Sequence, residues 1–208
     1  MVWLFCLYYY YGSLCYLPQP YMDQLSNFIN ARVVINADDL QVILSKFKER
    51  TLEKGQFIVR KGQIVNHYFF LRSGALRFFY GDYEQENTSW VVFQDDFFTE
   101  ISSLAPQVPT RFNIEAIEPS DIIYIDRADM EVLYKQFPAW QEFGRKLWET
   151  MSVRMISQII SFQTLSAEER YLEFMKTPEL IKRVPVKHLA SFLGITPSSL
   201  SRIRKNIK

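Results

Sequence analysis

Two serines and an arginine near the end of the chain stand at a spacing that suits contact with DNA. Ser198, Ser199 and Arg202 share one face of a helix that we predict from Pro197 to about Asn206, opposite two apolar residues. An arginine on such a face can bind a guanine edge through two hydrogen bonds, and a serine can bind a base or a phosphate. We predict that Arg202 reads a base and that Thr196, with the helix N-terminus, holds a phosphate. Backbone contacts that set the salt dependence are expected from Lys187, His188, Arg204 and Lys205.

The elements that must position these side chains are two short helices and the turn between them. From Val186 onward, apolar residues recur at the spacing of two helices that cross at a steep angle. Ala190 is small where the helices come closest, and Gly194 stands just past the first helix, where the backbone often needs a positive φ. Thr196 and Pro197 are favoured residue types at the N-cap and the first position of a helix. Together these features predict a helix-turn-helix.

The charge is distributed unevenly along the chain. No acidic residue and seven basic residues occur between Leu180 and Lys208. The whole chain has 24 basic and 23 acidic residues, so the remaining 17 basic and 23 acidic residues carry a formal charge of −6. A basic end on an acidic body suits a module that meets phosphates, although a solvated basic tail would show the same charge.

The composition excludes several classes of function. The only cysteines, Cys6 and Cys15, are too few for a disulfide framework or an iron–sulfur sensor, and this use of cysteine fits a reducing cytoplasm. The only histidines are His67 and His188, whereas a metal enzyme on a jelly roll needs two or three facing the barrel interior. We therefore predict no metal site, no evident cofactor and no enzymatic activity.

The first 21 residues are aromatic and uncharged, unlike the rest of the chain. A signal peptide would need a basic n-region, and a membrane anchor would need a longer run without Gly12 and Ser13. We favour a third interpretation, in which residues 1–21 are an atypical extension from a mis-assigned start and Met22 is the initiator.

The pattern of residues 22–137 predicts a β-roll with flanking helices. Amphipathic helical spacing covers about 23–48, and short β-branched and aromatic runs punctuated by glycine follow from Arg50 to Ile125. Such runs favour an antiparallel barrel or jelly roll, which makes the fold class α+β. The expected core of the roll includes Phe69, Leu71, Leu76, Phe78 and Tyr80.

A long helix is predicted at residues 138–165, after a short one closed by Pro138. Its apolar stripe is wide, and such a stripe usually buries against a partner helix. We expect a two-fold dimer through this helix, with packing on the protein's own barrel as the alternative. The predicted dimerisation residues are Leu147, Met151, Met155, Ile159 and Phe162.

Residues 166–208 are predicted to form the small DNA-binding domain. Ser166 and Glu169 stand at the spacing of a capping box that opens a helix running to about Met175. Thr177 and Pro178 repeat the signature of a helix start.

A roll, a long helix and a terminal helix-turn-helix in this order resemble the Crp/Fnr family of bacterial transcription regulators. The resemblance runs from Met22 to Lys208 and includes the spaced glycines Gly55, Gly62 and Gly74 and the segment TPSSLSRIRK. It implies a homodimer that binds a near-palindromic DNA operator under the control of an effector in the roll. It also implies RNA polymerase as a partner, a cytoplasmic location and no membrane.

The resemblance places the effector site at FFTEISSLAPQVPTRFNIEA. Cyclic-AMP-responsive members carry a glutamate there and, about ten residues later, an arginine for the phosphate. Glu100 matches the glutamate, but Thr110 takes the arginine position and Arg111 comes one residue late. A shift of one residue in an extended segment turns a side chain to the opposite face, so we expect an effector other than cyclic AMP. The candidate effector-binding residues are Glu100, Ile101, Ser102 and Arg111.

One alternative function remains open from the residues. The roll could act as a cyclic-nucleotide-binding-like module that regulates a partner protein, with the terminal helices used for protein contact. The basic, acid-free end of the chain argues against this alternative.

Overall fold

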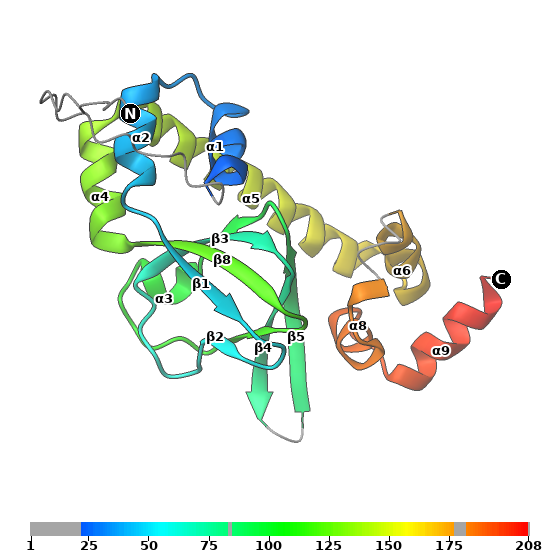
Figure 1. The fold of residues 1–208 in the computed structure, drawn as a ribbon. Coiled ribbons are helices and arrows are strands. Elements are labelled where there is room, and N and C mark those ends of the chain that lie inside the picture. Colours follow the sequence, from blue (N-terminus) through cyan, green and yellow to red (C-terminus); the bar gives the residue numbers. More distant parts are fainter. Residues whose placement is uncertain (1–21, 83–84, 177–181, 208) are drawn as a thin grey trace, which may run out of the picture.

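The structure is a computed structural model, which describes residues 22–82, 85–176 and 182–207. The predicted extension at 1–21 and the Thr177–Pro178 signature lie outside the described residues. A helical layer, a two-sheet roll, one long helix and a small C-terminal group of helices follow one another in the structure (Figure 1).

Two four-stranded antiparallel sheets form the roll, as the glycine-punctuated runs predicted. One sheet has the order β1-β8-β3-β6 and the other the order β2-β7-β4-β5. Their inner faces enclose an apolar core that includes Leu71, Leu76 and Ile122. The strands are β1 (Lys48–Leu52), β2 (Phe57–Val59), β3 (His67–Ser73), β4 (Ala75–Asp82), β5 (Gln85–Phe93), β6 (Phe97–Phe98), β7 (Asn113–Ala116) and β8 (Ser120–Asp126).

The turn between β3 and β4 depends on a glycine. Gly74 has a φ of +95°, which side chains rarely tolerate, and a Cβ there would lie 2.1 Å from the hydroxyl oxygen of Ser120. That hydroxyl accepts a hydrogen bond from the amide of Ala75 at 3.2 Å. The glycine therefore allows β8 to approach the turn directly.

One expected core residue of the roll is wrong. Phe69, Leu71, Leu76 and Phe78 are buried, but Tyr80 is 46% exposed. Residues 75–79 of β4 are all buried, because both faces of this part of the strand are covered. Tyr80 lies beyond this covered part, where its ring is edge-on to Phe112 at 5.7 Å and remains partly exposed to solvent.

Helices cover one end of the roll, and the longest of them continues beyond it. The covering helices share a second core with the outer side of the β3 sheet, in which Trp140 stacks on Phe143 with ring centres 4.5 Å apart. α5 is continuous for 27 residues, a length of about 40 Å. The helices are α1 (Asp23–Asn30), α2 (Ala37–Leu44), α3 (Ile101–Leu104), α4 (Arg127–Gln136), α5 (Pro138–Thr164), α6 (Ala167–Met175), α8 (Val186–Phe192) and α9 (Pro197–Asn206).

The last described helices share a third small core with residues of the roll beside β5. We call α6, α8 and α9 the C-terminal unit. Ser166 and Glu169 cap α6 reciprocally, as the capping box predicted. Gly194 takes a φ of +72° between α8 and α9, also as predicted, and Leu189, Ala190, Leu193 and Leu200 are buried together.

Candidate DNA-binding and effector sites

The helix α9 presents a polar and basic face to solvent. The Thr196 hydroxyl accepts a hydrogen bond from the Ser199 amide at 3.2 Å, and Pro197 opens the helix. Leu200 anchors the opposite face and is fully buried. This local order leaves exposed Thr196, Ser198, Arg202 and Lys205, with Ser199 half-buried.

Arg202 is held on this exposed face by a neighbour one turn earlier. Its Nη2 donates to the Ser199 hydroxyl at 3.2 Å, which aligns the guanidinium along the helix rather than away from it. The charge remains accessible, because the side chain is exposed. The helix N-terminus with its hydroxyls and this arginine make a surface able to contact phosphates and a base edge.

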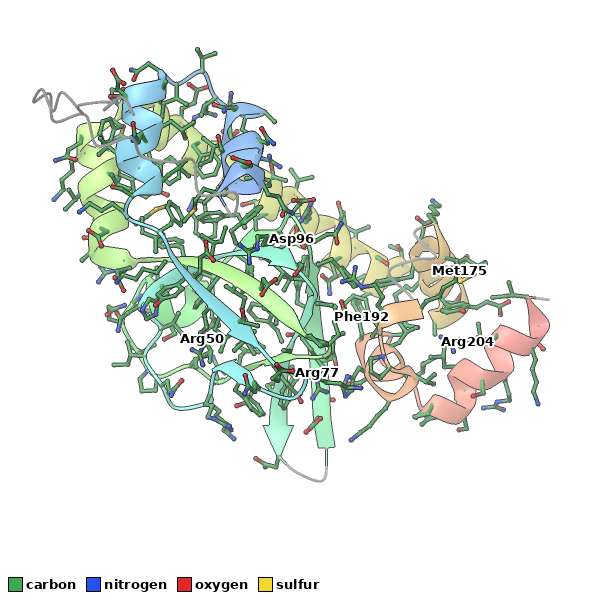
Figure 2. The ribbon with its side chains drawn as sticks, in the orientation of Figure 1. Arg50, Arg77, Asp96, Met175, Phe192 and Arg204 are labelled. Atoms are coloured by element: carbon green, nitrogen blue, oxygen red, sulfur yellow. The ribbon has the colours of Figure 1, made fainter. Side chains whose placement is uncertain are left out.

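Two of the predicted DNA-binding residues, Arg204 and His188, do not lie on this exposed face of α9. The Nε of Arg204 donates to the Tyr171 hydroxyl at 3.2 Å, on the side of α9 that faces α6 (Figure 2). His188 is half-buried near the roll, and its Nδ1 is buried with no hydrogen-bond partner among the described residues. Burial, and then the positive charge of Arg77, lower the pKa of His188 to about 4, so the imidazole is neutral at pH 7. Lys187, by contrast, is exposed.

Direct hydrogen bonds attach the C-terminal unit to the roll. The Ser191 hydroxyl on α8 accepts from the Thr88 amide at 2.8 Å and donates to the Glu86 carbonyl at 3.0 Å. Arg183 forms an ion pair with Glu118 and donates to the Gly74 carbonyl at 2.7 Å. Neither Ser191 nor Arg183 was predicted to have such a role. A hydroxyl among the apolar residues of α8 was the only signal for the first, and Arg183 was counted only within the basic end.

The predicted dimerisation residues lie along one broad face of α5, but their surroundings differ. Leu147 packs against the core shared by the helices and the roll, and Met151 is half-buried. Phe162 lies edge-on to Phe192 of α8 at 6.3 Å, and the Arg170 guanidinium lies 4.7 Å from its ring centre. Some residues of the apolar stripe therefore pack within the protomer, while others remain exposed and available for a dimer, because the stripe is wider than any one element that contacts it.

A further apolar surface on α5 has no covering element within the described chain. Val153, Ile156, Ile159 and Ile160 are each more than half exposed, and Met155 is 42% exposed. On the opposite side of the helix, Arg154 pairs with Asp96 at 2.8 Å and Gln158 donates to the Ser89 carbonyl at 3.2 Å. Figure 2 labels Asp96 at this junction between the roll and α5. The helix is thus fixed on one side and apolar on the exposed side.

The segment expected to hold an effector is closed around its own glutamate. Glu100 is only 4% exposed, and its Oε1 accepts from the Ser102 amide at 2.9 Å and from the Ser102 hydroxyl at 2.6 Å. The Ser102 amide, in the first turn of the short helix α3, therefore already donates its hydrogen bond to the Glu100 carboxylate. Ile101 and Ser102 are themselves exposed.

The next part of the segment places its arginine outside. Thr110 is buried, and its hydroxyl accepts from the Phe112 amide at 3.0 Å. Arg111 is exposed, which is the orientation that the one-residue shift predicted, and Phe112 is half-buried. Within the described residues, no guanidinium therefore takes the place that the resemblance gives to the phosphate of a cyclic nucleotide.

A cavity of about 170 Å³ lies between this segment, the roll and α5. Its wall is formed mainly by aromatic and methionine side chains. Glu100 also lines the cavity, and the described lining contains no lysine or arginine. The lining residues from α5 are Leu147, Trp148, Met151 and Met155.

No group of three or more histidine, cysteine, aspartate or glutamate side chains suited to a metal ion occurs within the described ranges. His67 is outside the cavity lining and its Nε2 lies 3.0 Å from the Asp126 carboxylate. In the part of the chain that the structure covers, no helix combines the length and apolarity needed to cross a membrane.

Comparison with known proteins agrees with this architecture. Residues 49–137 match the cyclic nucleotide-binding domain family. No curated protein matches the chain in sequence.

Solved structures share the fold at low sequence identity. A CooA mutant from Carboxydothermus hydrogenoformans superposes with a TM-score of 0.64 at 19% identity, over 84% of this chain and 85% of that one. FixK2 from Bradyrhizobium japonicum gives a TM-score of 0.64 at 16% identity, over 77% and 84% of the two chains. A protein from Eubacterium rectale assigned to the Crp/Fnr family of transcriptional regulators gives 0.63 at 18% identity, over 83% of each chain. Residues 49–137 thus resemble a cyclic nucleotide-binding domain, and the chain shares the fold of these solved structures, as the sequence resemblance predicted.

Proposed function

We propose that this protein is a DNA-binding transcription regulator of the Crp/Fnr type that acts as a homodimer on a near-palindromic operator. The observation that carries the proposal is α9, a capped helix whose exposed face holds Ser198, Arg202 and Lys205. A helix with its N-terminus free and a basic, hydroxyl-rich face suits insertion into the major groove.

Each residue on this face has a separate role in the proposal. Arg202 reads a guanine edge, which contributes about 1–3 kcal/mol of discrimination. Thr196, Ser198 and Ser199 contact a phosphate or a base near the helix start. Lys187 and Lys205 neutralise phosphates and set the salt dependence of binding.

The exposed apolar side of α5 supports the dimer. A second copy of Ile156 and Ile159, packed across a two-fold axis, would remove these side chains from water. A two-fold dimer also presents two copies of α9, which matches an operator with two half-sites.

The position of the cavity supports control by an effector. An occupant would touch the roll and α5 together, and α5 leads through Leu165 to the C-terminal unit. Arg111 is exposed and so does not offer its charge to a phosphate in the cavity, and the Ser102 amide already donates to Glu100. Cyclic AMP is therefore not the proposed effector. The regulator acts in the cytoplasm with RNA polymerase as its protein partner.

Recovery of genomic DNA fragments on the purified full chain tests this function. A shared palindrome among the recovered fragments is the expected result. Salt-sensitive binding without any shared sequence would contradict the proposal and would favour a roll that regulates a partner protein through its terminal helices.

A further inference from the structure

The cavity between the roll and α5 has a wall that is mostly apolar. Its aromatic contributors include Phe78, Trp90, Phe98 and Phe112, and two methionines of α5 complete the far side. A wall of this kind favours a largely apolar occupant, with polar groups only where the wall offers a partner. The absence of lysine and arginine from the described lining gives an anion nothing to pair with.

One polar group in this wall lacks a partner. Oε1 of Glu100 is satisfied by Ser102, but Oε2 is buried without any hydrogen-bond donor among the described residues. A buried carboxylate oxygen without a donor is costly, and natural structures leave few such groups unexplained. Glu100 lines the cavity, so a donor on an occupant that reaches Oε2 would satisfy it.

We infer that this cavity binds a small, largely apolar molecule that carries one N–H or O–H donor, which it directs to Glu100. The volume of about 170 Å³ suits a single or fused ring, since an apolar cavity of about 150 Å³ holds benzene. The same carboxylate repels a phosphate. This inference deepens the proposed function, because the regulatory meaning of the ligand rests on it, but binding itself is measured without DNA.

A comparison of indole with indene tests the contribution of the donor separately from that of the apolar ring system. The two molecules have nearly the same shape, and only indole has an N–H, which donates and does not accept. Calorimetric titration of the full chain is expected to give indole binding about tenfold tighter than indene, the effect of one hydrogen bond to a charged group. Equal affinities, or no binding of either, would overturn the inference on the unaltered protein alone.

The variant Glu100→Gln tests the acceptor. The amide oxygen can keep the bonds to Ser102, while the other carboxylate oxygen is replaced by an NH2 group, which donates and does not accept. The preference for indole over indene is expected to fall to about twofold or less, with indene affinity unchanged. A full preference in the folded variant would mean that Glu100 is not the acceptor.

The methionine methyl groups locate the ligand. In a chain labelled at the methionine methyls, indole is expected to shift the signals of Met151 and Met155, which line the cavity, through its ring current. Met175 lies in the C-terminal unit outside this cavity and is expected to stay in place. A shift of Met175 without the other two, or shifts at Met151 and Met155 caused by cyclic AMP, would contradict the assignment.

These results are independent of DNA. If no operator is recovered while the indole preference persists, the regulator proposal fails and the ligand class stands. If an operator is recovered while indole and indene bind equally, the ligand class fails and the regulator stands.

Discussion

Ser191 on α8 and Thr88 on β5 form a hydrogen bond of 2.8 Å between the C-terminal unit and the roll. The same hydroxyl donates to the Glu86 carbonyl at 3.0 Å, so one side chain bridges two backbone groups of a single strand. Thr88 is 6% exposed, and its amide has little access to water in this arrangement. Ser191 therefore acts as a bridge that holds the C-terminal unit in one position.

The change Ser191→Ala is expected to loosen this attachment. The Thr88 amide would lose its acceptor, at a cost of roughly 1–2 kcal/mol. Hydrogen exchange at the Thr88 amide is expected to accelerate by about tenfold, the factor that corresponds to this free energy. Ser201→Ala is the matched control, because the Ser201 hydroxyl donates only to the Pro197 carbonyl of its own helix. Equal exchange in the two variants would mean that Ser191 does not hold the unit.

The change Arg202→Ala is expected to remove operator preference while leaving weak binding to random duplex. The loss on the operator should be about 1–3 kcal/mol, because a base contact is removed and the phosphate contacts remain. Fluorescence anisotropy with both DNAs measures the two affinities. Lys205→Ala provides the comparison, since it should weaken binding to both DNAs alike and reduce the salt slope by about one. If Arg202→Ala behaves in the same way as Lys205→Ala, Arg202 reads no base.

The change Ile156→Asp is expected to give monomers. Ile156 is 57% exposed, so a carboxylate there leaves the protomer intact but places a charge in the proposed dimer interface. Sedimentation velocity compares its mass with that of the unaltered chain. Thr150→Asp adds the same charge at an exposed position on another side of α5 and should remain dimeric. A persistent dimer in the Ile156 variant would place the interface elsewhere.

Acid is expected to destabilise the protein through His188. Its pKa is lowered to about 4 in the folded chain by burial and by Arg77, with opposing attraction from Glu86 and further repulsion from Lys187 and Lys54. The unfolded chain, with its ordinary histidine value, binds the proton more tightly. The stabilisation is therefore complete above about pH 6.5 and is lost as the pH falls toward 4.

Urea unfolding at a series of pH values measures this contribution. In the variant His188→Gln, the free energy of unfolding should vary less between pH 6.5 and 4 than in the unaltered chain. Parallel curves for the unaltered chain and the His188 variant would remove His188 as the cause.

The change Gly74→Ala is expected to destabilise the roll more than Gly62→Ala. Both glycines have φ near +90°, so both substitutions strain the backbone. The added methyl at residue 74 also meets Ser120, whereas nothing lies within 4 Å of the same position at residue 62. Urea unfolding is expected to show an additional loss of about 1–3 kcal/mol at residue 74. Equal losses would mean that β8 can move away from the turn.

Local signals in the sequence were sufficient for the helix starts and turns. The cap at Thr196, the glycine at 194 and the capping box of Ser166 and Glu169 depend on neighbours within four residues, and all three are present. The outward position of Arg111 likewise followed from alternation along an extended segment.

Contacts between segments that are distant in the sequence could not be predicted from such local signals. The period of α5 indicated a wide apolar stripe, but it could not assign Leu147 to the protein's own core and Ile159 to the exposed side. Tyr80 is exposed because it lies beyond the part of β4 that other elements cover, and the docking of α8 on β5 turns His188 toward the roll. Each of these outcomes depends on a partner many residues away, which periodicity does not specify.

Only Leu165 and Ser166 separate α5 from α6. This short tether keeps the C-terminal unit at a high effective concentration beside β5, whether or not the Ser191 bridge is formed. Contacts with an affinity on the order of millimolar between separate molecules are therefore sufficient to hold it there. Severing the chain at this connection would remove this effective concentration and leave the contacts alone to hold the two fragments together.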